Sequence, residues 1–220
     1  MASNWEDLNA RGISAIVMVI VGAFDVYMGG IWFHFLVMFA TGVMIWELWS
    51  MIAPSRTTGA MLMAVATVAI LSVQIEEQNE ILPFLFLIIP AIGAVLLKKL
   101  RIAFFFYALA IIVAGFALVM FRDQFGALWI VWLLLVVIAS DVLGYFAGRT
   151  FGGPKFWPAI SPKKTWSGTV AGWIGAGIVG LVFALFTEAS MILVPLSMLL
   201  SFAGQLGDIA ESAIKRRTGI

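Results

Sequence analysis

Apolar residues form eight long runs along this chain, and short segments rich in glycine, proline or charge separate them. The runs are continuous rather than alternating, which favours helices over the strands of a membrane barrel. A helix needs about 20 residues to cross a bilayer, close to the length of most runs. The predicted spans are 13–30, 31–52, 59–75, 81–97, 102–121, 126–147, 167–187 and 190–207. The pattern predicts an all-α fold, a polytopic membrane helical bundle of about eight transmembrane helices.

The boundary between the first two spans is the least marked. Together these spans contain about forty mostly apolar residues, which are too many for one crossing. Gly29 and Gly30 can adopt backbone conformations that turn the chain. We therefore predict two helices that meet at this pair of glycines.

Composition excludes several classes of protein. Of 220 residues, 63% are hydrophobic, and only 13 Lys+Arg and 12 Asp+Glu carry charge. Soluble domains have about a quarter of their residues charged, so no soluble domain is expected. The formal net charge of +1 provides no strong field for nucleic acid. Because the chain has no cysteine, disulfides, thiolate metal sites and cysteine nucleophiles are excluded.

The charges also predict the orientation of the spans. With the amino terminus in the cytoplasm, Arg122 is the one basic residue outside and the other twelve of thirteen lie inside, as the positive-inside rule demands. The acidic segment 76–80 then lies outside. No small-residue cleavage site precedes the first span, so it is read as a retained helix rather than a signal peptide. Both termini are predicted to be cytoplasmic, in an integral protein of the bacterial inner (cytoplasmic) membrane.

The amino-acid composition of the chain changes after about residue 125. Residues 1–125 are mostly apolar, whereas 141–220 concentrate Gly, Ser, Thr, Lys and Asp. We treat 1–220 as a single integral-membrane domain in which 1–125 supplies mostly scaffold helices. The cytoplasm-facing catalytic part is then 126–220, incomplete at its C-terminus.

Ionisable residues inside spans are candidates for function because charge is costly in lipid. Asp25 is expected to have a structural role and to reach the membrane interface. For Glu47, a packing or ion-pair role is favoured slightly over a catalytic one. His34 has no acid or second histidine at i+3 or i+4, so a core or interface role is expected.

Asp141 differs from these three residues because of the residues that surround it in the sequence. On a helix it shares one face with Gly144, Tyr145 and Gly148. The GxxxG spacing permits close contact with another helix. A satisfied acid at a packing face and a carboxylate at a functional seam remain equal alternatives.

The segment 148–168 combines glycines, hydroxyls and four cations, which suit phosphate. Thr165 or Ser167 is expected to cap the seventh helix, whose N-terminal amides add positive potential. A lipid-headgroup anchor would use the same cations, so both interpretations stay open.

The last segment brings hard oxygen ligands beside cations. On a helix Asp208, Glu211, Ser212 and Lys215 form one polar stripe. Mg²⁺ is usually shared between one or two carboxylates and substrate phosphates. A solvated helix end would not require the two glycines that flank Gln205, so a functional site is favoured.

Three motifs in this order resemble those of the phosphatidate cytidylyltransferase (CDP-diacylglycerol synthase) family. The motifs are Asp141…Gly144-Tyr145-Phe146…Gly148-Arg149, Ser161-Pro162-Lys163-Lys164-Thr165-Trp166-x-Gly168 and Gly204-Gln205-x-Gly207-Asp208-x-x-Glu211-Ser212-x-x-Lys215-Arg216. All three lie on the predicted cytoplasmic side. The resemblance covers 140–220 closely, and the pair Trp46-Glu47 is similar to the family's early span.

One departure from the family concerns its C-terminal signature. The signature begins Ser-x-aliphatic-Lys-Arg, here Ser212 to Arg216, and continues after four variable positions with residues that include a second metal-binding Asp in the family. This chain stops at Ile220, on the fourth variable position. We therefore expect a truncated product that folds and inserts but has little or no activity as it stands.

The resemblance implies that CMP is transferred from CTP to phosphatidate, which gives CDP-diacylglycerol and pyrophosphate. The attacking phosphate is already anionic, so alignment and charge neutralisation carry the catalysis. The implied metal is Mg²⁺, with a second cation left open. The implied catalytic residues are Asp208, which also binds the metal, Asp141 and Glu211. The implied substrate-binding residues are Ser161, Lys163, Lys164, Thr165, Lys215 and Arg216.

Other functions and properties remain open at this point. A CTP-dependent polyprenol or phytol kinase shares the hydrophobicity and a related style of motif. A non-enzymatic membrane transporter would explain intramembrane acids, although transporters usually show broken helices in two halves. The expected partners are CTP, phosphatidate and membrane lipids, with no nucleic acid, and a homodimer is left open together with the acyl-chain preference.

Overall fold

A computed structural model describes residues 2–77 and 82–219 of the protein. It divides into two compact units, Met1–Ala127 and Leu128–Ile220. Within the described ranges, six helices are long and apolar enough to cross a membrane, and Ile16–Met28 and Phe84–Leu96 are shorter apolar helices. These eight segments coincide with the eight predicted spans, so the polytopic helical fold is confirmed.

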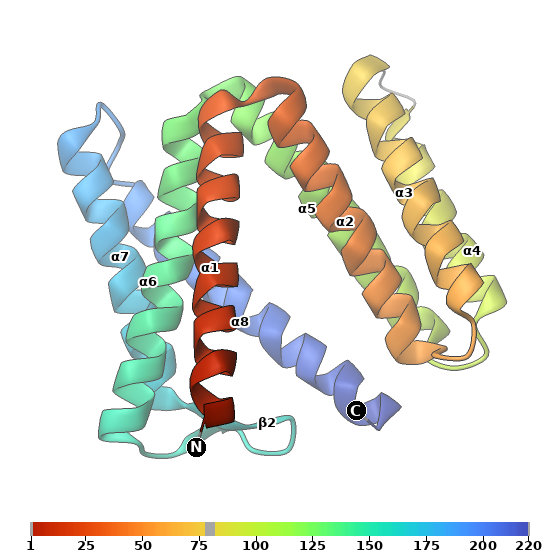
Figure 1. The fold of residues 1–220 in the computed structure, drawn as a ribbon. Helices are drawn as coiled ribbons and strands as arrows, with labels where there is room; N and C mark the ends of the chain where they lie inside the picture. Colours follow the sequence, from red (N-terminus) through yellow and green to blue (C-terminus); the bar gives the residue numbers. More distant parts are fainter. Residues whose placement is uncertain (1, 78–81, 220) are drawn as a thin grey trace. The chain divides into compact units, whose positions relative to one another are not determined.

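The described residues of the first unit form five α-helices and one 3₁₀ segment (Figure 1). These are α1 (Ala2–Met28), α2 (Gly30–Ile52), α3 (Thr57–Glu77), η1 (Leu82–Leu87), α4 (Ile88–Leu96) and α5 (Arg101–Phe125). The predicted span 81–97 is found as a helical segment, which begins as 3₁₀ and continues as α-helix. Pro90 lies in the first turn of α4, where its missing N–H costs no helical hydrogen bond. Most of the acidic segment 76–80 lies outside the described residues.

The turn between α1 and α2 is confirmed at the predicted glycines. Gly29 and Gly30 have φ angles of 63° and 51°, the left-handed region that glycine adopts at low cost. Arg122 of α5 donates from Nε to the Val26 carbonyl at 3.0 Å and from Nη2 to the Tyr27 carbonyl at 3.3 Å. A cation at a helix C-terminus satisfies orphan carbonyls and opposes the helix dipole. The basic residue predicted outside therefore holds the end of α1.

The ionisable residues of the first unit have varied surroundings. His34 Nε2 lies 2.8 Å from Asp123 Oδ2, a partner 89 residues away that local spacing could not reveal. Asp25 is only 7% exposed, which agrees with the structural role expected for it. Glu47 is exposed, and no ion pair to it occurs among the described residues. The preferred packing or ion-pair role for Glu47 is therefore not found in this unit.

As far as residue 219, the second unit forms three long helices and a β-hairpin. They are α6 (Ala127–Phe151), β1 (Lys155–Trp157), β2 (Ser161–Thr165), α7 (Trp166–Phe186) and α8 (Leu193–Thr218), and the two strands are antiparallel. In Figure 1 the hairpin joins one end of α6 to the start of α7. The sequence pattern predicted only an anion-binding loop here, and neither strand was predicted. Their composition, with Pro162 and three lysines, carries no alternating apolar pattern that would indicate a strand.

Glycines let α6 and α7 approach each other closely. A Cβ atom added at Gly144 would lie 3.2 Å from the Gly168 carbonyl oxygen, and one added at Gly148 would lie 2.9 Å from Thr165 Oγ1. The predicted GxxxG contact of α6 is therefore present, and its partner is the start of α7. By contrast, a Cβ at Gly204 or Gly207 would meet nothing within 4 Å, so packing does not explain these two glycines.

Replacing Gly168 by alanine should destabilise the protein. A Cβ there would lie 2.5 Å from the Gly144 carbonyl oxygen, so the two helix backbones must separate. Overpacking of this kind costs about 1–3 kcal/mol. We expect a lower thermal unfolding temperature for Gly168→Ala in detergent. Gly204→Ala is the matched control, because open space surrounds that position, and equal temperatures for the two variants would contradict the packing.

Candidate active site

One cavity of about 460 Å³ opens in the second unit. Its wall is formed by one end of α6, by β2, by the first turn of α7 and by the polar half of α8. The lining residues are Ser140, Asp141, Gly144, Tyr145, Gly148, Arg149, Lys163, Lys164, Thr165, Gly168, Thr169, Gln205 and Asp208. Three cations and two carboxylates are thus gathered around one space, next to helices that are otherwise apolar.

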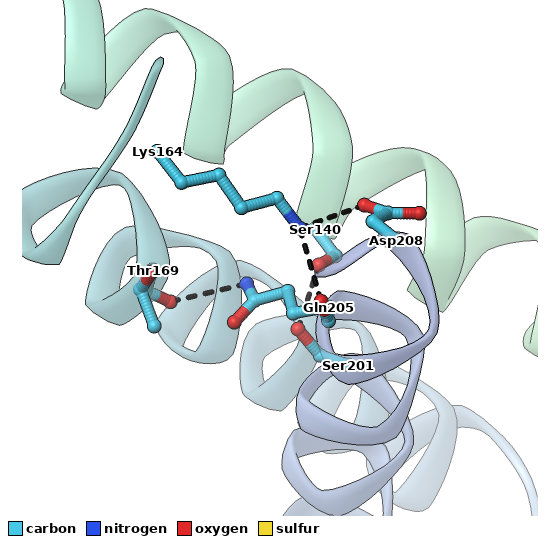
Figure 2. A network of polar contacts seen from close by, with 6 residues as sticks. All are labelled: Ser140, Lys164, Thr169, Ser201, Gln205 and Asp208. Carbon is cyan, nitrogen blue, oxygen red and sulfur yellow. Dashed lines mark hydrogen bonds and ion pairs between the residues drawn. The ribbon is translucent and has the colours of Figure 1, made fainter. Parts of the chain in front are cut away.

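An ion pair crosses this cavity from the hairpin to α8. Lys164 Nζ lies 2.8 Å from Asp208 Oδ2 and donates to the Gln205 carbonyl oxygen at 3.1 Å. Figure 2 shows the extended Lys164 side chain with its nitrogen between these two acceptors. The Asp208 side chain is 59% exposed, so the pair contributes little to stability. Its importance lies in bringing two motifs, 44 residues apart, to one point.

The hairpin is fastened to the start of α7. Thr165 is the N-cap of α7, and its Oγ1 accepts a hydrogen bond from the Gly168 N–H at 3.3 Å, so the capping prediction is confirmed for Thr165. Trp166 N–H donates to the Pro154 carbonyl at 3.0 Å, and its ring centroid lies 4.6 Å from that of Phe156. These contacts fix the strand that carries Lys163 and Lys164.

Polar side chains also connect the three helices beneath the cavity. Ser140 Oγ of α6 lies 2.6 Å from Ser201 Oγ of α8, and both residues are buried. Gln205 Nε2 donates to the Thr169 carbonyl of α7 at 3.3 Å, as Figure 2 shows. A Cβ at Gly172 would lie 2.7 Å from Gln205 Nε2, so glycine there makes room for this amide. The network holds α8 in register with α6 and α7, and hence Asp208 at the cavity.

The carboxylates of the cavity suit a divalent cation that is shared with phosphate. Asp141 and Asp208 both line the cavity. The described part of the chain contains no group of three His, Cys, Asp or Glu side chains that could hold a metal. Mg²⁺ usually takes one or two carboxylates and completes its shell with substrate phosphates and water. The donor set therefore fits Mg²⁺ bound together with a phosphate-containing substrate.

The sequence-predicted site residues fall into two groups. Those at the cavity are Asp141, Lys163, Lys164, Thr165 and Asp208. Those that do not line it are Ser161, Glu211, Lys215 and Arg216. Ser161 pairs with Trp157 at the start of β2, and Glu211 forms an ion pair with Lys215 one turn along α8.

Other cavity residues were not among the predicted site residues. Ser140, Thr169 and Gln205 belong to the network beneath it, and Tyr145 and Arg149 lie on its α6 wall. One signal for the network was present in the sequence, because Ser197, Ser201 and Gln205 recur every four residues and share one face of α8. Thr169 could not be found in this way, since it contributes a backbone carbonyl.

The helices and the cavity define a class of protein, an integral membrane protein whose cavity gathers three cations and two carboxylates. Comparison with known proteins is more specific. The Cytidylyltransferase family matches residues 9–220, and the chain belongs to that family.

Individual relatives are consistent with this assignment. A phosphatidate cytidylyltransferase of Brucella abortus biovar 1 (strain 9-941) is 30% identical over 227 residues, which cover 97% of this chain and 82% of the relative. The phosphatidate cytidylyltransferase of Staphylococcus saprophyticus is 38% identical over 121 residues, 54% of this chain and 46% of the relative. That of Bacillus subtilis is 37% identical over 97 residues, 43% of this chain and 36% of the relative.

Proposed function

We infer that this protein is a nucleotidyltransferase that transfers CMP from CTP to phosphatidate. The products are CDP-diacylglycerol, a precursor in phospholipid biosynthesis, and pyrophosphate. The observation that carries the inference is the convergence of the Lys163-Lys164 motif and Asp208 on one cavity, in a chain whose family match spans 9–220. Family membership favours this reaction over a CTP-dependent kinase or a transporter.

The reaction needs little covalent participation from the protein. A phosphate oxygen of phosphatidate attacks the α-phosphorus of CTP, a new P–O bond forms, and the α–β bridging bond breaks. The bond electrons leave with pyrophosphate. Because the attacking phosphate oxygen is already anionic, no proton has to be removed from it. Alignment of two anions and neutralisation of their charge are the tasks that remain.

We propose that Lys163 and Lys164 bind the phosphates of CTP and that Thr165 donates a hydrogen bond to them. Lys164 has the most direct part, since its ammonium already lies 2.8 Å from an anionic oxygen of Asp208. On binding, Lys164 exchanges this carboxylate for phosphate, which frees Asp208. Ser161, Lys215 and Arg216, which lie beyond the cavity, are proposed as outer phosphate contacts.

We propose Asp208 as the residue that holds Mg²⁺, with Asp141 as a second carboxylate and Glu211 as support through its pair with Lys215. Bound Mg²⁺ would neutralise charge on the triphosphate and on the leaving pyrophosphate. A second cation would have to share these oxygens.

The acceptor lipid provides the test of this function. In mixed micelles with CTP and Mg²⁺, we expect a chain that carries the complete C-terminal signature, called the full-length protein below, to convert phosphatidate to CDP-diacylglycerol, identified by mass spectrometry. Polyprenol or phytol supplied in place of phosphatidate should give no phosphorylated product. A phosphorylated alcohol without CDP-lipid would contradict the inference.

We further propose that the cavity faces the cytoplasm, in the inner membrane of a bacterium, with both termini on that side. The 21 residues of α7 are about 31 Å long at 1.5 Å per residue, close to the thickness of the hydrocarbon core. The hairpin before α7 and the turn after it should therefore lie on opposite sides. The basic residues favour the cytoplasm for the hairpin.

Single cysteines can test this orientation without a background, since the chain has none. Ala159→Cys lies between the two strands, and Ser190→Cys lies between α7 and α8. A membrane-impermeant maleimide should label Ala159→Cys from the cytoplasmic side and Ser190→Cys from the opposite side. The reverse pattern would overturn the proposed orientation.

A further inference from the structure

The α6 wall of the cavity carries a cation that the nucleotide chemistry above does not use. Arg149 lies one turn after Tyr145, and its Nη1 donates to the Tyr145 hydroxyl oxygen at 2.8 Å. Both residues line the cavity and both are exposed. The hydrogen bond holds the guanidinium in a fixed position, and the Tyr145 hydroxyl hydrogen stays available to a ligand.

Arg149 and Lys164 also differ in whether their positive charge is paired with a carboxylate. Lys164 is paired with Asp208, whereas Arg149 has no carboxylate within ion-pair distance in the ranges that the structure describes. A guanidinium presents two parallel N–H groups that match two oxygens of one phosphate. Arg149 is therefore ready to bind an anion without first losing a partner.

The surroundings of this pair indicate where the anion comes from. On the same helix, Val142 is 46% exposed and Phe146 is 60% exposed, next to Tyr145 at 59%. Because α6 is long and apolar enough to cross a membrane, a bilayer around it would bring acyl chains against these exposed side chains. An arginine and a tyrosine at the end of such a helix reach the level of the lipid headgroups. CTP, by contrast, reaches the cavity from water.

We propose that Arg149 and Tyr145 form the subsite for the phosphomonoester of the lipid substrate, on the bilayer side of the cavity from Lys163 and Lys164. The guanidinium binds two phosphate oxygens, and the Tyr145 hydroxyl donates to one of them. This inference rests on the proposed function, and it assigns the two substrates of that reaction to two walls of one cavity.

The test separates the two substrates kinetically in the full-length protein. For Arg149→Gln we expect the KM for phosphatidate, as a mole fraction in mixed micelles, to rise about tenfold or more, because a charged bidentate contact is lost. The KM for CTP should stay within about twofold of wild type. Arg149→Lys keeps the charge but loses the two parallel N–H groups, and Tyr145→Phe removes one hydroxyl. Each variant should therefore raise the KM for phosphatidate by about threefold.

Arg217→Gln is the matched control. Arg217 is an exposed arginine at the end of α8 that does not line the cavity. The KM of the Arg217→Gln variant for phosphatidate should equal that of wild type. An equal rise in Arg217→Gln would show a general attraction of surface charge for anionic lipid, and a rise in the KM for CTP instead would assign Arg149 to the nucleotide; either result overturns the proposal.

A binding measurement without CTP keeps this inference distinct from the proposed function. Dioctanoyl phosphatidate is titrated into the detergent-solubilised protein and followed by tryptophan fluorescence, with inorganic phosphate as the non-lipid probe. We expect Arg149→Gln to weaken phosphatidate binding and inorganic phosphate to compete poorly. Arg149-dependent binding in a protein that makes no CDP-lipid would contradict the proposed function but not the phosphatidate subsite. Equal binding by wild type and Arg149→Gln, in a protein that makes CDP-lipid, would contradict the subsite but not the proposed function.

Discussion

Asp208→Asn should abolish Mg²⁺-dependent formation of CDP-diacylglycerol. Asparagine keeps the volume and one acceptor oxygen but removes the charge that a hard divalent cation requires. Groups that neutralise charge in a transition state are worth about 100-fold or more in rate, so the rate should fall at least that far. The measurement is the initial rate in mixed micelles over a range of Mg²⁺ concentrations.

The loss should not come from unfolding. The Asp208 side chain is 59% exposed, and an exposed ion pair of this kind contributes about 0–1 kcal/mol to stability. The thermal unfolding temperature of Asp208→Asn in detergent should therefore be close to that of wild type. Turnover near the normal rate, in a folded variant, would refute the metal assignment.

Lys164→Met should be the second most damaging change. It removes the one ammonium that contacts both Asp208 and the Gln205 carbonyl. If Lys164 binds the triphosphate, kcat/KM for CTP should fall by about 100-fold while the KM for phosphatidate changes little. Lys155→Met is the control, because Lys155 is an exposed cation of β1 that does not line the cavity. Comparable losses in the two variants would indicate that only the net charge of the hairpin matters.

The double variant separates a functional role of Lys164 from a structural one. If Lys164 served only to neutralise Asp208, then Asp208→Asn should restore much of the activity lost in Lys164→Met. If both residues act on substrate, the double variant should be no more active than Asp208→Asn alone, because members of a catalytic unit are not additive. The comparison needs only steady-state rates of the four proteins.

Hydrophobic patterning predicted the helices of this protein well, for a physical reason. In lipid every backbone polar group must be bonded within the segment, so a continuous apolar run has little choice but to be helical. Even the turn at Gly29 followed from the length of the apolar stretch and the two adjacent glycines. The 3₁₀ start of the segment 82–96 did not, because local helix geometry depends on a few residues rather than on the apolar run.

The site was predicted in part, and the limits follow from what periodicity contains. Helical spacing correctly set Asp208 and Lys215 on one face of α8, but it contains no information on how far along the helix a neighbouring element extends. Lys215 lies seven residues beyond Asp208, about 10 Å along the axis. The cavity therefore includes Asp208 and excludes Lys215.

Contacts between segments far apart in the chain could not be predicted from the sequence pattern. The pairing of Lys164 with Asp208 depends on a hairpin whose strands have no apolar alternation, and on buried hydroxyls that fix α8. The hydrogen bond between His34 and Asp123 is a similar case, since a search at i+3 and i+4 cannot find a partner on another helix. Motifs indicated which residues carry chemistry, and the fold determined which of them meet.

The fate of the phosphates of CTP tests the central claim most directly. The full-length protein is given phosphatidate micelles, Mg²⁺ and CTP labelled with ³²P at either the α or the γ position, and the lipid is then extracted. A cytidylyltransferase joins the α-phosphorus to the lipid, so the α label should enter the lipid fraction and the γ label should leave as pyrophosphate. Entry of the γ label into lipid, or of neither label, would contradict the account.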